Sequence, residues 1–506
     1  MTRPCNLGDF VNRTGSPDRP LIIGLEGDGP AQVLTRGAFD ALADGFARGL
    51  LKRGLRRGDR IAILAANRPD YVAAFMGAMR AGIVPVPVNF KFPAAAIAQV
   101  IADCGARLVL HDAERLPALA GTLPDVTRIA FDGDGADTLA GWLDPGPFVP
   151  VTPEPGETAL SLYTSGSTGR PKGVLLSHAA HIWVAQTRMA DTDLTGERVL
   201  IAAPLYHMNA LALAILVCAS GASAVMLPQF KAEDYIAAIS AHACTFLTAV
   251  PPMIAMMLRE KEALARADLS SVRLVRMGSA PVNGSLAEQI HALLPNAHII
   301  NAYGTTEGGP IVFGSHPDGH PAPTGSVGYP HPEVAVRLVQ GATPDEGVLE
   351  MKSPALMLGY HNRPDVRSPI TPDGYYSTGD VFRRDAQGFY YFVGRADDMF
   401  VSGGENIFPG EVEAVLETHP DVLQACVVPV EDDIKGQKPV AFVVRRPGTS
   451  LDEATLKAYV LANAPAYAHP RRVWFLDQML LASTNKIDRA TLKRRAEAEL
   501  NGATAS

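Results

Sequence analysis

The chain has 506 residues, of which 45 are Lys or Arg and 53 are Asp or Glu, so its formal net charge at pH 7 is −8. This length is more than one hydrophobic core usually serves, and two or more domains are therefore expected. Because no basic excess offsets the acidic charge, the composition argues against a general nucleic-acid binder.

Cysteine usage and the absence of targeting segments favour a protein of the cytoplasm. The five cysteines are scattered without paired spacing, so neither a disulfide framework nor a zinc site is expected. The first residues lack the apolar run of a signal peptide. The apolar stretch 210–228 approaches the length of a membrane span. Ser220-Gly221 divides this stretch, however, which favours a buried helix, a turn and a buried strand over a span.

Residues 1 to about 155 alternate helical and strand-like segments. Apolar residues recur at helical spacing over 39–51 and 71–79, and continuous apolar runs cover 60–65 and 83–88. This βαβ rhythm predicts an α/β fold with a mostly parallel sheet covered on both faces. No catalytic constellation stands out here, and the segment is interpreted as scaffold.

The next segment, Tyr163-Thr-Ser-Gly-Ser-Thr-Gly-Arg-Pro-Lys172-Gly-Val, lies between two apolar runs. It indicates a strand, a flexible polar turn and a second strand. Backbone N–H groups and hydroxyls of such a turn can converge on a polyphosphate, and Lys172 adds a positive charge. The common nucleoside-triphosphate loop requires Ser or Thr after its lysine, whereas Gly173 follows Lys172. Taken alone, six such residues are more often a solvated turn.

The whole string closely resembles the phosphate-binding signature of the AMP-forming acyl- and aryl-CoA synthetases, a superfamily that includes luciferases and peptide-synthetase adenylation domains. Further motifs below extend the resemblance over most of the chain. It implies a large N-terminal domain (residues 1–394) of parallel-type sheets with helices and a small β subdomain, followed by a small mobile C-terminal α/β domain (395–506). It also implies that Thr164 contacts a metal ion, and that ATP contacts are made by Thr164, Ser165, Gly166, Ser167, Thr168, Gly169 and Lys172.

A histidine follows the next strand, in Ala203-Pro-Leu-Tyr-His207-Met. A single histidine in this position is more often a structural hydrogen-bonding group than a catalyst. In the resembled family this segment forms part of the carboxylate-substrate pocket. Adenylation domains that select amino acids usually carry an aspartate there to hold the ammonium group. His207 offers no anion, which favours a plain carboxylic acid as the substrate.

The motif Tyr303-Gly-Thr-Thr-Glu307 follows a strand over 297–302. Its glycine lets a flat ring approach the backbone, Tyr303 supplies a stacking face, Thr306 can donate to a phosphate, and Glu307 suits Mg²⁺. Alone, Thr-Thr-Glu could also begin a helix. The resemblance makes it the adenine and magnesium motif and places the nucleotide against Ser279, Ala280, Pro281, Asn301, Ala302, Tyr303, Gly304 and Thr305.

A stretch dense in turns and short strands, from about 317 to 393, predicts the small β subdomain. Within it, Asp380 follows Ser-Thr-Gly, where a carboxylate can accept both ribose hydroxyls of a nucleotide. A surface aspartate in a Gly-Asp turn is an equally good interpretation without context. The resembled family assigns this aspartate to the ribose.

Residues 389–413 are the second strongest signal, an aromatic strand followed by Gly394-Arg395, two acids and a glycine turn. The resemblance implies that Arg395 contacts the ribose or phosphate and that Asp397 is the hinge of the C-terminal domain. It also implies that Gly403 and Gly404 line the tunnel through which the thiol of coenzyme A reaches the site.

The last hundred residues again show a βαβ pattern and end with Ser483-Thr-Asn-Lys486-Ile-Asp-Arg489. A lysine between polar residues is normally a solvated charge. The resembled family places its adenylation lysine in a Gly-Lys-x-x-Arg turn here, and Lys486 and Arg489 match. Asn485 replaces the glycine, and Asn tolerates left-handed backbone angles. The nucleotide end of coenzyme A is predicted to contact Lys435, Tyr467, His469 and Arg471.

Together these features predict ATP-dependent ligation of a small carboxylic acid to coenzyme A through an acyl-adenylate, with Mg²⁺. The catalytic residues would be Lys486, His207, Thr306 and Glu307. Chain length, His207 and the run 402–407 most resemble bacterial aryl-CoA ligases of the chlorobenzoate type. Short- or medium-chain fatty-acid ligases, an enzyme that loads a separate carrier protein, and a non-catalytic regulator are the alternatives, and a homodimer is left open.

Overall fold

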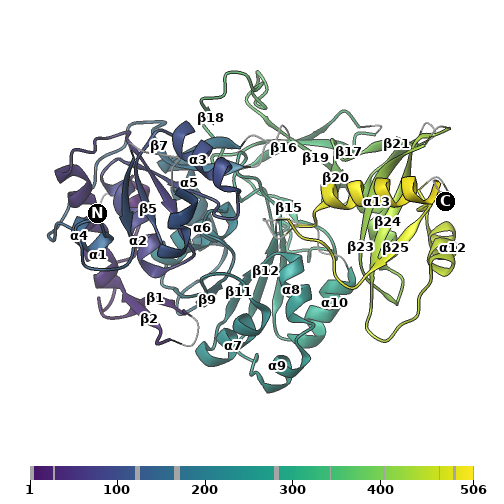
Figure 1. Ribbon diagram of the computed structural model, residues 1–506, viewed down its shortest axis with the longest axis horizontal. Coiled ribbons are helices and arrows are strands. Elements are labelled where there is room, and N and C mark those ends of the chain that lie inside the picture. Colours follow the sequence, from purple (N-terminus) through teal and green to yellow (C-terminus); the bar gives the residue numbers. More distant parts are fainter. Residues whose placement is uncertain are drawn as a thin grey trace.

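The computed structural model describes residues 5–26, 29–119, 126–164, 171–278, 284–341, 343–402, 405–432, 434–466, 468–482 and 486–504. Figure 1 shows a broad N-terminal body, coloured purple to green, and a smaller C-terminal body in yellow-green at the other end of the longest axis. The predicted α/β class is confirmed: parallel sheets with covering helices form the N-terminal body, and the C-terminal body is a small α/β domain.

One sheet is parallel throughout, as the first 155 residues predict. Its strand order is β4-β3-β5-β6, and its strands are β3 (Arg60–Leu64), β4 (Val84–Pro87), β5 (Ala106–His111) and β6 (Thr127–Ala130). The accompanying helices are α1 (Arg36–Lys52), α2 (Pro69–Arg80), α3 (Ala94–Asp103) and α4 (Leu139–Trp142), with 3-10 turns η1 (Leu7–Asp9) and η2 (Ala113–Leu119).

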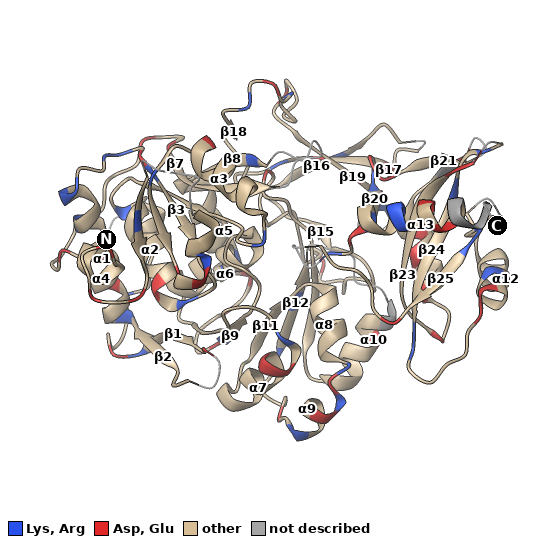
Figure 2. Cartoon of the chain, in the orientation of Figure 1, with Lys and Arg blue, Asp and Glu red and all other residues tan. Residues whose placement is uncertain are grey.

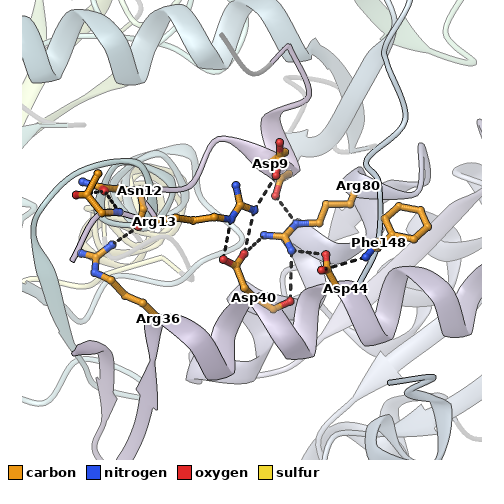
Figure 3. A network of polar contacts seen from close by, with 10 residues as sticks. Asp9, Asn12, Arg13, Arg36, Asp40, Asp44, Arg80 and Phe148 are labelled. Atoms are coloured by element: carbon orange, nitrogen blue, oxygen red, sulfur yellow. Dashed lines mark hydrogen bonds and ion pairs between the residues drawn. The ribbon is translucent and has the colours of Figure 1, made fainter. Parts of the chain in front are cut away.

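A buried arginine ties these helices together. Arg80, at the end of α2, has no exposed surface and donates to the carbonyl oxygen of Gly8 (2.8 Å), to Asp44 (2.6 Å) and to Asp40 on α1. Arg13 donates to Asp40 from the other side (Figure 3). A buried cation requires such partners, because its desolvation is otherwise unfavourable. This network therefore supports the scaffold interpretation of the N-terminal segment.

The seven-stranded sheet carries the site. Its order is β13-β12-β11-β9-β10-β1-β2, and all neighbours are parallel except β1 and β2. The strands are β1 (Pro20–Gly24), β2 (Gln32–Thr35), β9 (Arg198–Ile201), β10 (Ser223–Met226), β11 (Phe246–Ala249), β12 (Leu274–Gly278) and β13 (His298–Ala302). The helix and strand predicted within 210–228 are confirmed as α6 (Met208–Ala219) and β10.

Helices cover both faces of this sheet, as continuous apolar strands require. One core joins the sheet to α5 (His178–Asp191) and α6, and the other joins it to α7 (Ala232–His242), α8 (Pro251–Met257) and α10 (Gly284–Leu293). The short α9 (Lys261–Arg266) borders the second core. Because side chains alternate along a strand, Val275 and Met277 of β12 enter the second core, whereas Leu274 packs against the first.

The predicted strand–turn–strand around the glycine-rich segment is confirmed at its two ends. Strands β7 (Thr158–Thr164) and β8 (Lys172–Ser177) are antiparallel, and β18 (Gly359–His361) adds to the outer edge of β8. Residues 165–170 of the turn, which hold the predicted Ser165, Gly166, Ser167, Thr168 and Gly169, lie outside the described residues.

The predicted β subdomain is a four-stranded antiparallel sheet with a separate small hairpin. The sheet has the order β16-β17-β19-β20, and the hairpin pairs β14 with β15. The strands are β14 (Phe313–Gly314), β15 (Tyr329–Pro330), β16 (Ala335–Val339), β17 (Glu346–Lys352), β19 (Tyr376–Arg384) and β20 (Tyr390–Arg395).

The sheet of the C-terminal α/β domain is mixed. Strands β23 (Val422–Asp432) and β24 (Gly436–Arg445) form a long antiparallel pair, and only β25 (Val473–Leu476) lies parallel to β24. The short connection between β23 and β24 permits a hairpin but no crossover helix. The remaining elements are β21 (Phe400–Ser402), β22 (Glu405–Ile407), α11 (Pro409–Glu417), α12 (Glu453–Asn463) and α13 (Arg489–Thr504).

Acidic and basic residues are interspersed along both bodies (Figure 2). Among the helices within the described ranges, none combines the length and apolar character that crossing a bilayer requires.

Candidate active site

Several of the predicted site residues gather at one edge of the seven-stranded sheet. Parallel strands β9, β11, β12 and β13 end at the same edge, and the segments that follow them carry His207 and Tyr303. The carboxyl edge of a parallel sheet is where ligands bind in α/β proteins. Ala302, the last residue of β13, lies opposite Gly278, the last residue of β12. Ser279, Ala280 and Pro281 directly beyond Gly278 lie outside the described residues.

A chain of polar contacts links the sheet edge to the β subdomain. The Tyr303 hydroxyl donates to Oδ2 of Asp380, Nη1 of Arg395 donates to Oδ1 of Asp380 (3.1 Å), and Nε of Arg395 donates to Asp397 (2.9 Å). Asp380 and Arg395 face one another because β19 and β20 pair in that register. The structure therefore brings together three residues that lie far apart in sequence and that were predicted as nucleotide contacts.

Burial sets the ionisation of this chain. Desolvation raises the pKa of Asp380, against hydrogen bonds from Tyr303 and Arg395 and the positive charge of Lys486. Burial and the Asp380 carboxylate together raise the pKa of Tyr303. Burial alone would raise the pKa of Asp397. The hydrogen bond and positive charge of Arg395 outweigh this effect, so the pKa of Asp397 is lowered. Asp380 is thus a buried carboxylate held in place by two donors.

Glu307 lies in a tight turn from Thr305 to Gly309. Thr305 and Gly309 form a bridge, and the Thr305 hydroxyl accepts from the Gly308 N–H (2.8 Å). Gly309 has a φ of +91°, and a Cβ there would lie 2.5 Å from that of Ala355, so the turn requires glycine. Gly304 is equally constrained, since its Cβ would lie 2.6 Å from Pro310 Cα. Thr306 is half-buried within this turn.

Tyr360 holds the Glu307 carboxylate and was not predicted. Its hydroxyl donates to Oε1 of Glu307 (3.2 Å), and Nζ of Lys172 lies 5.2 Å from the centre of its ring. Burial raises the pKa of Glu307, and the Tyr360 bond and the positive charges of Lys172 and Arg395 oppose this only in part. A buried carboxylate whose desolvation is only partly offset would be stabilised by a further cation beside it.

Lys486, from the far end of the chain, enters the same site. Burial lowers the pKa of Lys486, an effect that the Asp380 carboxylate opposes and the Arg395 guanidinium reinforces. Burial and the positive charges of Lys486 and Lys91 lower the pKa of His207 to about 4. Lys486 therefore lies within electrostatic reach of both Asp380 and His207, so the C-terminal domain is docked with its predicted lysine at the sheet edge.

His207 precedes the first residue of α6 and is held by aromatic contacts. Its ring lies 4.6 Å from that of Tyr206, which packs edge-on against Phe90 at 5.2 Å. Nε2 of His207 and the Tyr206 hydroxyl are buried and have no partner among the described residues. Because buried polar atoms are normally satisfied, they mark a place where a polar ligand group would fit.

A small cavity of about 120 Å³ opens beside this histidine segment. It is lined by Lys91, Pro204, Gln229, Phe230, Pro252, Met253, Met256 and Leu481. Leu481 belongs to the segment that leads to Lys486, so the C-terminal domain contributes one residue to the lining of the cavity. The small residues Ala249 and Ala302 lie at the ends of β11 and β13.

The remaining predicted residues lie in three places. Nδ2 of Asn301 donates to the carbonyl oxygens of Gly325 (3.3 Å) and Ser326 (3.2 Å). In the C-terminal domain, Nη1 of Arg471 lies 2.7 Å from Nδ1 of His469. Burial is the main cause that lowers the pKa of His469, and the positive charge of Lys435 adds to it. Gly403, Gly404 and Tyr467 lie outside the described residues.

Comparisons with known proteins agree with this geometry. The model of the family described as AMP-binding enzyme matches residues 11–361, and that of the AMP-binding enzyme C-terminal domain matches 411–486. A feruloyl-CoA synthase of Amycolatopsis sp is 34% identical over 461 residues, covering 89% of this chain and 91% of that protein. A sulfoacetate–CoA ligase of Cupriavidus necator is 31% identical over 494 residues, 95% of each chain. The crystal structure of ATP-bound MatB from Rhodopseudomonas palustris has a TM-score of 0.87 at 25% identity, covering 97% of this chain and 99% of that one.

Proposed function

The chain belongs to the AMP-binding enzyme family and is an AMP-forming acyl- or aryl-CoA synthetase, and we propose that its substrate is a small aromatic carboxylic acid. The observation that carries the proposal is the convergence of Lys486 on Asp380 and His207. It brings the lysine of the C-terminal motif together with the candidate ribose acceptor Asp380 and with His207 of the candidate acid-pocket segment. The feruloyl-CoA synthase among the relatives acts on an aromatic acid, by its name.

We propose that the acid lies against His207 with its carboxylate near Lys486. A carboxylate oxygen would attack the α-phosphorus of ATP in line, forming an acyl-adenylate while pyrophosphate leaves. Lys486 and Arg395 would neutralise the charge that develops on the phosphate oxygens, and Asp380 would accept the ribose hydroxyls. The glycine-rich segment 164–169, Lys172 and Thr306 would hold the departing phosphates. Adenine would lie between Tyr303 and the segments 279–281 and 301–305.

Magnesium fits this site through Glu307. Mg²⁺ is usually held by one or two carboxylates together with substrate phosphates. Among the described residues, the one group of three possible metal ligands is His316, Asp318 and His320, in the loop after β14, so Glu307 has no ready-made protein cage. Glu307 and Thr164 would hold the ion, which would neutralise charge on the phosphates.

The second half-reaction uses the other face of the C-terminal domain. We propose that residues 395–506 rotate about Asp397, which withdraws Lys486 and brings Gly403 and Gly404 to the site. The thiolate of coenzyme A would then attack the adenylate carbonyl and release AMP. Lys435, Tyr467, His469 and Arg471 would bind its nucleotide end. We further propose a cytoplasmic enzyme, in keeping with five cysteines that are all free thiols.

The proposal is tested by following AMP formation with ATP, Mg²⁺ and a panel of aromatic, short-chain and medium-chain acids, with and without coenzyme A. Multiple turnovers that require coenzyme A and are fastest with an aromatic acid would support it. Preference for an aliphatic acid would favour the fatty-acid alternative. Adenylate formation that coenzyme A does not accelerate would favour loading of a carrier protein, and no AMP from any acid would favour a regulator.

A further inference from the structure

Two arginines converge on one carbonyl oxygen beside the candidate site. Nη2 of Arg188, on α5, lies 3.1 Å from the carbonyl oxygen of Pro310, and Nη2 of Arg276, on β12, lies 3.5 Å from the same atom. Neither arginine forms an ion pair with any carboxylate within the ranges that the structure describes. Both residues are half-buried, so part of their surface is exposed.

The register of the sheet places this pair directly beneath the site. Arg276 lies opposite Thr248 of β11 and Ile300 of β13. Its neighbours Val275 and Met277 enter the core on the far face, so the Arg276 side chain points to the face that α5 and α6 cover, where the site segment after β9 begins α6. Arg276 precedes the strand end at Gly278 by two residues, a distance of roughly 7 Å along the strand.

The pair also adjoins the turn that carries Glu307. Pro310, whose carbonyl receives both guanidinium groups, packs against Gly304 so closely that no side chain fits between them. The hydroxyl of Thr248, directly beside Arg276 in the sheet, is buried and has no partner among the described residues. Unpaired cations and an unpaired hydroxyl thus lie together one layer below the sheet edge.

The electrostatics of the pair call for an anion. Burial lowers the pKa of Arg188 to about 10, with only the charge of Asp191 opposing it. Burial and the neighbouring charge of Arg188 lower the pKa of Arg276 well below its usual value, and the charge of Asp191 opposes this only in part. Two desolvated like charges that share one neutral acceptor, with Asp191 acting on them without an ion pair, oppose folding, and a directly bound anion would reduce this penalty.

We propose that Arg188 and Arg276 bind a second anionic group, a carboxylate or sulfonate, on the acid that is activated at the sheet edge. The inference rests on the proposed function and narrows its substrate class to compact dianionic acids. A planar guanidinium binds either oxyanion through paired hydrogen bonds. The roughly 7 Å from the strand end to Arg276 suits two groups held across a single aromatic ring.

Matched acids test the substrate class. Benzoate, terephthalate, 4-sulfobenzoate and the neutral isostere 4-carbamoylbenzoate would be compared by initial rates of coenzyme A-dependent AMP formation. We expect kcat/KM for terephthalate or 4-sulfobenzoate to exceed that for 4-carbamoylbenzoate by about 10- to 100-fold, as for a charge-assisted hydrogen bond. The two dianions distinguish a carboxylate from a sulfonate requirement. Equal or better use of the two monoanions would overturn the inference and leave the proposed function standing.

Variants separate anion binding from a structural role of the pair. We expect Arg276→Gln and Arg188→Gln each to raise KM for the preferred dianion by about 10- to 100-fold while changing KM for 4-carbamoylbenzoate little. Arg276→Lys should restore part of the loss. Arg198→Gln is the matched control, since Arg198 also lies on this sheet and donates to a carbonyl oxygen, that of His242 (2.6 Å), but begins β9 at the opposite edge. Equal KM changes for both acids would show that the pair only holds Pro310.

A binding measurement is independent of turnover. Without ATP, 4-sulfobenzoate and terephthalate should raise the melting temperature of the wild-type enzyme more than 4-carbamoylbenzoate does, and this difference should vanish in Arg276→Gln. A difference that persists in Arg276→Gln, or no difference in the wild type, would overturn the inference. This test measures binding and needs no product, so it remains valid even if no acid in the panel is activated. A lack of activation would count against the proposed function and not against the anion site.

Discussion

Arg489 and Glu413 form a two-point ion pair that joins the start of α13 to α11. Nη2 of Arg489 donates to Oε2 of Glu413 (2.6 Å), and Nη1 contacts Oε1 and the carbonyl oxygen of Val427 (3.0 Å). The arginine of the last motif is thus turned into the C-terminal domain, three residues after the lysine that enters the site. Its role in this structure is to anchor the segment that presents Lys486.

Removing the anchor should destabilise the C-terminal domain and disturb Lys486 together. We expect Arg489→Gln to lower the free energy of unfolding by about 3 kcal/mol, because it leaves the buried Glu413 charge unpaired. The adenylation rate should also fall, although Lys486 itself is still present, because the segment that carries it is no longer anchored. Arg489→Gln/Glu413→Gln should recover most of the stability, and Arg494→Gln, at an exposed site on the same helix, is the control. Chemical denaturation and pyrophosphate release provide the readouts; a stable Arg489→Gln enzyme with a normal rate would contradict this role.

Glu307→Gln should stabilise the ligand-free enzyme and abolish its use of magnesium. A pKa raised by burial means that ionised Glu307 opposes folding above that pKa, and the penalty disappears below the carboxyl pKa of the unfolded chain. The variant should therefore melt about 2 °C higher at pH 8 and gain nothing near pH 4. Thermal scans over this range and a Mg²⁺ titration of activity test both statements. A lower melting temperature at pH 8 would show that the charge is already compensated.

His207 should act as a neutral ring throughout the physiological range. Burial, Lys486 and Lys91 hold its pKa near 4, so protonation is complete only in strong acid. We expect His207→Asn to raise KM for the acid about tenfold, since a polar contact is lost, without shifting the pH profile between pH 5.5 and 8. An acidic limb near pH 6 that disappears in the variant would show instead that the histidine titrates during turnover.

Lys486→Ala should separate the two half-reactions. Loss of the cation beside Asp380 and His207 should slow adenylate formation by about 100- to 1,000-fold, because charge developing on the phosphate is no longer neutralised. Transfer from a chemically prepared acyl-adenylate to coenzyme A should remain within a few-fold of wild type. Lys493→Ala, on α13, is the control. Equal loss in both steps would argue that Lys486 is not withdrawn between them.

The sequence patterns predicted helices and strands that depend on local periodicity. They missed contacts between residues far apart in the chain, which depend on how strands and helices pack. The helices and strands over 36–88 carry strong periodicity, and the elements match it. Helix α13 is mostly polar, with Leu492 and Ala496 buried, so its pattern was too weak to predict. The Glu307–Tyr360 contact spans 53 residues, and β18, which positions Tyr360, is only three residues long. The convergence of Arg188 and Arg276 likewise follows from the packing of α5 on the sheet.

Oxygen tracing tests the central claim, that the carboxylate attacks the α-phosphorus and forms an acyl-adenylate. The preferred acid, labelled with ¹⁸O in both carboxylate oxygens, would be converted with ATP, Mg²⁺ and coenzyme A, and the products analysed by mass spectrometry. Attack at the α-phosphorus leaves one labelled oxygen on AMP when the thiolate displaces it, so we predict singly labelled AMP and unlabelled pyrophosphate. Label in pyrophosphate or inorganic phosphate, with none in AMP, would contradict the account.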